Sequence, residues 1–105
     1  MSAARLAWGE GGSCALSGEL SVESVPGLWA RGDELWRRGP ELVLDLSGVR
    51  RSDSAGLALL AEWTRQARQH GLSLHYRGMP EQMRALARVS GLERLLPLET
   101  NNCGE

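Results

Sequence analysis

The sequence contains no lysine, no phenylalanine and only one tyrosine. A phosphate-binding loop of the Walker type and an enzyme that forms a Schiff base both need a lysine amine, so the chain fits neither class. All twelve basic residues are arginine, and thirteen acidic residues balance them to a net charge of −1. With this balance and so few phenylalanine or tyrosine rings to stack bases, we expect no nucleic-acid partner.

Cysteines and long apolar runs are also scarce. Cys14 and Cys103 are far apart in the sequence, which favours free thiols in a reducing compartment over a disulfide framework. His70 and His75 lie on either side of an element boundary and not on one helix face, so we expect neither a metal nor a cofactor. No apolar run approaches the roughly 20 residues that span a bilayer, and the opening "MSAARLAWGE" lacks a signal-peptide stretch. We therefore expect a cytoplasmic protein without direct membrane insertion.

The chain is long enough for one modest hydrophobic core. We expect a single domain over residues 1–98, followed by a disordered tail over residues 99–105. Alternating apolar residues with glycine-rich turns between them predict an antiparallel hairpin of two strands, at 5–9 and 13–20.

The remaining elements alternate between helix and strand. In order, we predict an amphipathic helix at 24–39 loosened by Gly32, a central strand at 41–48 buried on both faces, a helix at 54–70, a strand at 72–78, a helix at 80–91, and a short strand or turn at 92–98. Trp29, Trp36 and Trp63 are predicted to lie in the core, and Trp8 either in the core or at a sheet edge. This order predicts an α/β fold in which three to four helices pack on a mixed sheet of four to five strands.

The helix predicted after the central strand has more apolar surface than one buried face requires. On a helical wheel, one stripe faces the core, and it consists of Gly56, Leu59, Leu60, Trp63 and Ala67. Leu57 lies at the margin of that stripe, and Ala58 and Ala61 lie beyond it, on the face that carries Arg65 and Arg68. This surplus indicates a surface for a partner. The alternative is that the alanines only favour helix formation and that Leu57 packs beneath a neighbouring loop.

A polar knuckle, residues 50–56 (RRSDSAG), joins the central strand to this helix. Asp53 or Ser54 is placed to cap the helix, where free backbone N–H groups bind a side-chain oxygen or an anion. Gly56 costs helix stability but would let another chain approach the backbone closely. The run "SDSAG" is also close to the G-x-S-x-G motif of serine hydrolases, with His75 as a distant base, but its first glycine is missing. An interaction surface is therefore a better interpretation than an active site.

The run "DLSGVRRSDSAGLALL" resembles the signature of STAS domains, which leads from a central strand into a helix. The matching positions are Asp45, Leu46, Ser47, Val49, Asp53, Ser54, Gly56 and Leu57. The resemblance extends over residues 13–98, and it implies the fold that anti-sigma-factor antagonists share with regulatory modules of transporters. Two positions depart from the family: Ala55 replaces the hydroxyl residue that is phosphorylated in antagonists, and the polar Ser52 replaces an apolar residue. The resemblance thus implies an interaction domain without that phosphorylation switch.

The opening "RLAWGEGGSCALSGELSVESVPGLW" and the run "DSAGLALL" are similar to the stand-alone STAS subunits of Mla phospholipid-transport ABC complexes. This resemblance implies a non-enzymatic subunit, without a cofactor, that binds the transporter ATPase at the inner membrane and so supports outer-membrane lipid asymmetry. The residues expected to contact the partner are Asp53, Ser54, Ala55, Gly56, Leu57, Ala58, Ala61 and Arg65. The alternative is an anti-sigma-factor antagonist that binds an anti-sigma kinase. Exposed apolar helix surface also leaves a weak homodimer open.

Overall fold

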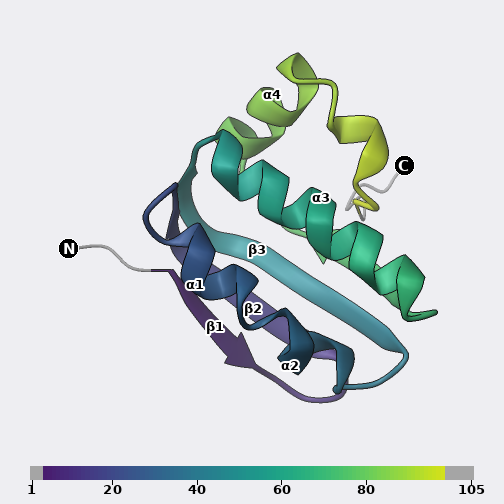
Figure 1. Ribbon diagram of the computed structural model, residues 1–105. Helices are drawn as coiled ribbons and strands as arrows, with labels where there is room; N and C mark the ends of the chain where they lie inside the picture. The colour runs from purple at the N-terminus through teal and green to yellow at the C-terminus, as the bar shows by residue number, and fades with distance from the viewer. Residues whose placement is uncertain (1–3, 99–105) are drawn as a thin grey trace.

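A four-stranded sheet with helices on one face makes up the computed structural model, which describes residues 4–98 (Figure 1). Along the chain the elements are β1 Arg5–Trp8, β2 Ser13–Leu20, α1 Val25–Trp29, α2 Gly32–Trp36, β3 Glu41–Ser52, α3 Ser54–Gln69, β4 Ser73–Arg77, α4 Glu81–Val89 and the 3-10 turn η1 Glu93–Leu95. The strand order is β1-β2-β3-β4, in which β1 and β2 are antiparallel and the other neighbours are parallel. The predicted α/β class, the mixed sheet and the N-terminal hairpin are confirmed.

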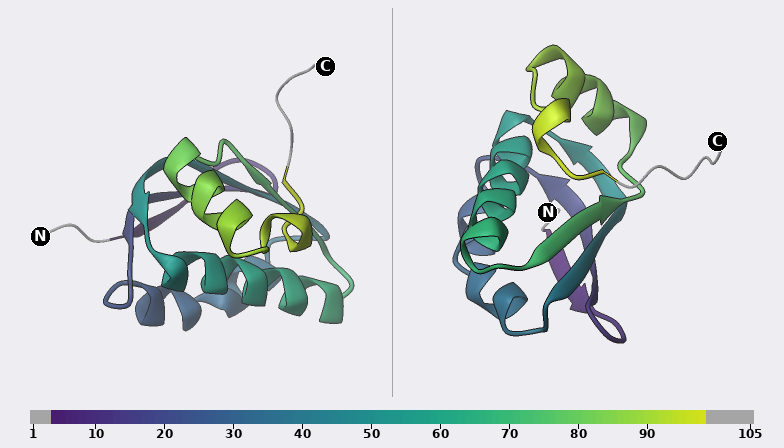
Figure 2. Two further views of the ribbon diagram at one scale, coloured as in Figure 1. Left: turned by 90° about the horizontal axis from the view of Figure 1, so that it is seen from above. Right: turned by 90° about the vertical axis from the view of Figure 1, so that its right-hand side faces the viewer.

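The helices form a second layer over the sheet. Figure 2 shows α1, α2 and α3 along one face, with α4 beside α3 near the end of β3. Within residues 4–98, no helix covers the other face of the sheet (Figure 2). Among the helices of residues 4–98, none is both long enough and apolar enough to cross a membrane.

The central strand β3 differs from its prediction in two ways. It continues to Ser52 because Gly48 stays within the strand: a Cβ there would lie 2.8 Å from the Cβ of Ser17 in β2, so glycine permits the close approach. It is also not buried on both faces, since buried side chains alternate with more exposed ones such as Val43 and Asp45. The prediction of a doubly buried strand is wrong because helices cover only one face of this sheet.

The single helix predicted at 24–39 is two short helices, α1 and α2. They are separated just before Gly32, whose missing side chain leaves room for Trp63 of α3: a Cβ on Gly32 would lie 3.1 Å from the indole nitrogen. Leu28 of α1 and Leu35 of α2 are both buried on either side of this break. The sequence correctly indicated a weak point at Gly32, and in the structure the helix is interrupted at Ala30 and Arg31, directly before it.

Hydrogen bonds in the core hold α3 against β4. The hydroxyl of the fully buried Tyr76 donates to the carbonyl oxygen of Leu60 at 2.7 Å and lies 3.0 Å from the hydroxyl of Thr64. Burial raises the pKa of Tyr76 above its ordinary value, because a charged phenolate would lose its hydration. The phenol is therefore a structural group that fixes the position of the helix.

The tryptophans divide between the core and the surface. Trp63 has no exposed surface, as predicted, and Trp36 is half-buried. Trp8 is half-buried on the edge strand β1, with the guanidinium carbon of Arg38 4.1 Å from its ring centroid. Trp29 is 43% exposed, so its assignment to the core is wrong.

The C-terminal part follows its prediction. Met83 and Ala87 are the buried residues of α4. Residues 92–98 combine both predicted possibilities, because η1 is a helical turn and Leu98 forms a parallel bridge with Tyr76 at the edge of β4. The predicted disordered tail, residues 99–105, lies outside the described residues.

Candidate functional site

The polar knuckle is the place where β3 ends and α3 begins. Asp53 is the N-cap of α3: its carboxylate accepts a hydrogen bond from the Ala55 N–H at 2.8 Å, and its own N–H donates to the Leu20 carbonyl at 3.0 Å. Of the two predicted caps, Asp53 therefore fills the role, and Ser54 is left exposed at the start of the helix. These bonds attach the knuckle to the end of β2.

The polar Ser52 points into the protein and forms a hydrogen bond inside the knuckle. It is 2% exposed, and its hydroxyl donates to the Asp53 carbonyl at 2.9 Å. The side-chain amide of Gln82 in α4 accepts from the Ser52 N–H at 3.0 Å and donates to the Ser52 carbonyl at 2.9 Å. Gln82 thus holds the end of β3 from the side of α4. Sequence reasoning missed this residue because a glutamine 30 positions away carries no local signal.

Two residues predicted to contact a partner, Gly56 and Leu57, are buried inside the protein. A Cβ on Gly56 would lie 2.8 Å from the Cβ of Leu20 and would collide with the Ser52 hydroxyl. Glycine at this position therefore lets α3 approach the ends of β2 and β3, and not another protein. Leu57 has no exposed surface and belongs to the core. For these two residues, the structure contradicts a direct contact.

Ala58, Ala61 and Arg65 lie toward the outer side of α3. Ala58 is exposed and Ala61 is half-buried, while the Arg65 guanidinium donates to the Glu62 carboxylate at 3.0 Å. Hydrogen bonds from Arg65 and Gln66 lower the pKa of Glu62 to about 2. The charge of Arg65 is thus balanced within its own helix.

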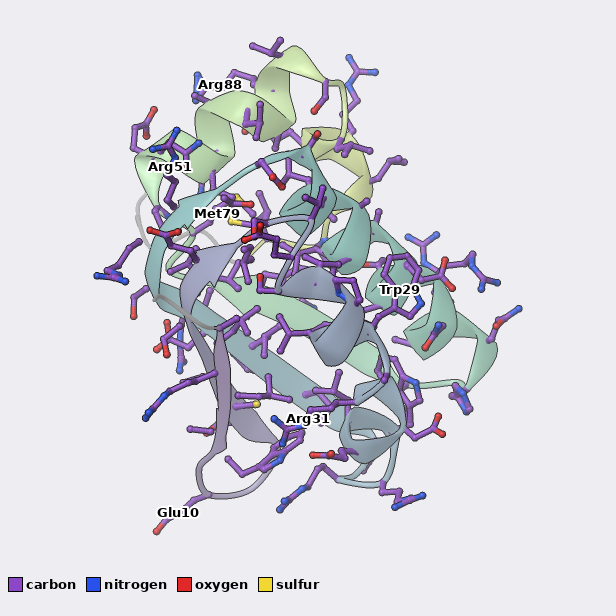
Figure 3. All side chains as sticks on the ribbon, turned by 60° about the vertical axis from the view of Figure 1, so that its left-hand side comes forward. Glu10, Trp29, Arg31, Arg51, Met79 and Arg88 are labelled. Carbon is purple, nitrogen blue, oxygen red and sulfur yellow. The ribbon has the colours of Figure 1, made fainter. Side chains whose placement is uncertain are left out.

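A groove beside the knuckle is the main surface feature that sequence reasoning missed. It has a volume of about 500 Å³ and is lined by Val22, Val25, Pro26, Trp29, Ala30 and Ala55. Val22 is 70% exposed, and the partly exposed Trp29 ends α1 (Figure 3). A helix of five residues is too short for a hydrophobic period to show which side faces solvent. The tryptophan was assigned to the core because residues 24–39 were interpreted as one longer amphipathic helix, on which it falls at helical spacing with the other apolar residues.

Ala55 connects this groove to the outer side of α3, because it lines the groove and lies one helical turn before Ala58. We call the groove residues together with Ser54, Ala58 and Ala61 the docking surface. Exposed apolar surface of this kind is typical of a protein-interaction site. The docking surface contains part of the predicted contact set and adds the face of α1.

The first part of the sequence motif has a structural role. The Asp45 carboxylate accepts a hydrogen bond from the Ser47 N–H at 2.9 Å, which lowers the pKa of Asp45. Gly78 passes beside this pair with a φ of +71°, and a Cβ there would lie 3.0 Å from the Asp45 Oδ1 atom. Asp45 therefore orders the chain where β3 and β4 come together.

The serine and histidine of the hydrolase alternative do not meet. Ser54 begins α3 on the helical side of the sheet, whereas His75 is exposed on β4 and lies beside Val43 on the other face. Within residues 4–98, no group of three or more His, Cys, Asp or Glu side chains is placed to hold a metal ion. His75 therefore cannot act as the base of Ser54 in this arrangement.

Known proteins share this architecture. A family model described as "Mlab, STAS domain" matches residues 8–97. An anti-sigma factor antagonist from Mycobacterium paratuberculosis is 23% identical, with a TM-score of 0.75 over 93% of this chain and 85% of that one. A serine-to-glutamate variant of RsbS from Moorella thermoacetica is 19% identical, with a TM-score of 0.68 over 94% and 87% of the two chains. Phosphorylated SpoIIAA from Bacillus is 17% identical, with a TM-score of 0.66 over 92% and 91%. No curated protein sequence matches the chain significantly.

The two kinds of likeness establish different things. At identities of 23% and below, the solved structures show the fold alone. The family model covers most of the chain, including the knuckle, α1 and the strand β3 between them. The sequence match, the element order and the geometry of the knuckle lead to one conclusion: the chain belongs to the STAS domain family.

Proposed function

We propose that this protein is a non-enzymatic STAS subunit that binds the ATPase of an ABC phospholipid transporter. Through this contact it supports the outer-membrane lipid asymmetry that the transporter maintains. The protein acts at the cytoplasmic side of the inner membrane, where its complex holds it without insertion into the bilayer. The docking surface makes the contact, and no cofactor takes part.

The apolar groove beside the knuckle is the observation that carries this proposal. Trp29 and Val22 both expose apolar side chains in its lining, and such surface is stabilised when a partner covers it. Tryptophan is also among the residues that most often dominate the binding energy of an interface. Asp53 caps α3 and so keeps Ala55 in place at the edge of the groove.

Three features favour a transporter ATPase as the partner. The matching family model carries the Mlab description, and the tryptophan-bearing opening resembles the Mla-type subunits. Ala55, which stands where sigma-regulating antagonists carry their phosphoacceptor, lines the groove. Because alanine has no hydroxyl to phosphorylate, this position offers no charge switch for releasing a partner. We therefore expect the contact between this protein and its partner to be constitutive.

A constitutive contact supports the ATPase by mass action. A subunit that binds only the folded ATPase stabilises it by about 2.7 kcal/mol when the free subunit is at 100 times its Kd. This effect needs no chemistry in the STAS subunit. It requires a rigid surface, which the bonds of Asp53 to Ala55 and Leu20 provide.

An anti-sigma-factor antagonist that binds an anti-sigma kinase is the second candidate. The likeness to the Mycobacterium paratuberculosis antagonist favours it, because that protein has the same fold over nearly the whole chain. The knuckle and α3 would then meet the kinase.

Co-purification distinguishes the two candidates. The chain is co-expressed with the Mla-type ATPase and, separately, with an anti-sigma kinase from the same genome. Two variants accompany the wild type: Ser54→Arg at the exposed start of α3, and Gln69→Arg at the exposed end of the same helix. Both add one positive charge, and circular dichroism checks that both remain folded.

The proposal predicts a stable complex with the ATPase that is lost in Ser54→Arg and kept in Gln69→Arg. Capture of the kinase instead would establish the second candidate. Equal binding of the ATPase by wild type and Ser54→Arg would show that the contact lies elsewhere on the protein.

A further inference from the structure

We propose that the ATPase segment seated in the groove carries lysine or arginine beside an apolar anchor. This inference rests on the proposed function and specifies the chemistry of the partner. It is drawn from the charged residues within the two chain segments that build the groove, which are of one sign.

The two chain segments that build the groove contain no basic residue. Glu23 is the only charged residue in residues 20–30, and Asp53 is the only one in residues 52–61. Both side chains belong to exposed residues. Glu23 directly follows the groove residue Val22, and the Asp53 carboxylate is bonded to the N–H of Ala55. The groove therefore has apolar walls, and the charged residues of the two segments around its rim are both acidic.

No arginine of the described chain, residues 4–98, forms a salt bridge with either the Glu23 or the Asp53 carboxylate. Arg31, which follows the groove residue Ala30, donates two hydrogen bonds to Glu34 at 3.0 and 2.9 Å. The nearest arginine along α1 and α2 is thus already paired.

Arg51 is part of the knuckle but faces away from the groove. The next residue, Ser52, is buried beneath the helices, so the side chain of Arg51 leaves β3 on the opposite face of the sheet. There its register neighbour in β2 is Glu19. Figure 3 shows Arg51 well apart from Trp29, at the end of the molecule where α4 begins.

A partner segment with basic residues is the occupant that this charge pattern favours. Lysine or arginine next to an apolar anchor would pair with Glu23 and Asp53 while the anchor packs on Trp29. An acidic segment would be repelled, because like charges brought together across an interface cost binding energy. A second copy of this chain is a poorer occupant, since it would bring the same acidic rim to the contact.

The test removes the two charges without changing shape. The double variant Glu23→Gln with Asp53→Asn keeps a good N-cap, because asparagine caps helices as well as aspartate. The control, Glu10→Gln with Glu41→Gln, removes two exposed carboxylates outside the two groove segments. The Kd for the purified ATPase is measured by calorimetry for all three proteins, at ionic strengths of about 0.05 M and about 0.5 M.

We expect the groove variant to bind about 2- to 30-fold more weakly than wild type at low salt, as the loss of two exposed ion pairs predicts. The difference shrinks at high salt, because salt screens such pairs, and the control binds like wild type. Equal or tighter binding by the groove variant would overturn this inference while leaving ATPase binding intact. Two results would overturn the proposed function as well. One is the absence of any complex between the wild-type protein and the ATPase. The other is a wild-type homodimer, detected by light scattering, that the Trp29→Asp substitution dissociates.

Discussion

Replacement of Gly56 by alanine tests whether this glycine serves internal packing or a partner. The new methyl group would lie 2.8 Å from the Cβ of Leu20 and would collide with the Ser52 hydroxyl. Overpacking of this kind costs about 1–3 kcal/mol, and the higher helix propensity of alanine offsets about 1 kcal/mol. Two contacts that need movement of β2 and β3 place the cost at the upper end. We expect a net loss of about 2 kcal/mol, which lowers the Tm by roughly 10 °C in a domain of this size.

Gly27→Ala provides the matched control. This glycine lies in α1, and a Cβ there would meet nothing within 4 Å. The substitution should therefore leave the protein unchanged or stabilise it by up to about 1 kcal/mol. Urea denaturation and thermal unfolding, both followed by circular dichroism, measure the two variants against wild type. A Gly56→Ala protein as stable as wild type, or two variants that shift in the same direction, would refute the packing argument.

Three further predictions concern buried or paired groups. Tyr76→Phe removes the hydroxyl that bonds the Leu60 carbonyl and should cost about 1–2 kcal/mol in urea denaturation; an unchanged midpoint would show that this bond contributes nothing net. Burial raises the pKa of Cys14 to about 11. In a Cys103→Ser chain, the remaining thiol should therefore react with a thiol reagent at about pH 8 only after the protein unfolds. Fast labelling of the folded protein would contradict the burial of Cys14. Hydrogen bonds lower the pKa of Glu62 from 4.5 to about 2, so its contribution to stability is complete above about pH 4.5 and is lost as the pH falls toward 2. The free energy of unfolding of Glu62→Gln should therefore fall less than that of wild type over that pH range. An equal fall in both proteins would show that the Glu62 carboxylate does not contribute to stability.

Much of the fold could be predicted because local patterns and the packed structure agree. The hairpin, the core stripe of α3 and the alternation of β4 each follow from a period of apolar residues that is long enough to be unambiguous. The length of β3 was not predictable in this way. In the sequence, Gly48 indicates the end of a strand. In the structure it lies within β3, where its missing side chain lets β2 pass close by.

The candidate site was only partly predictable. Asp53 carries a strong local signal as a helix cap, and Ala58 follows from the helical wheel. Leu57 was misplaced because a wheel shows the direction of a side chain but not how far neighbouring elements extend over it. Trp29 was misplaced because α1 is only five residues long, too short for its apolar residues to show which side faces solvent.

The affinity of the Trp29→Asp variant for the ATPase tests the central claim most directly. Val89→Asp is the matched control, since it places the same charge on an apolar side chain that is 87% exposed on α4, outside the docking surface. Calorimetry with the purified ATPase should show a loss of about 30-fold or more for Trp29→Asp, as expected for the anchor of an interface, and little change for Val89→Asp. Wild-type affinity in a folded Trp29→Asp protein would contradict the account.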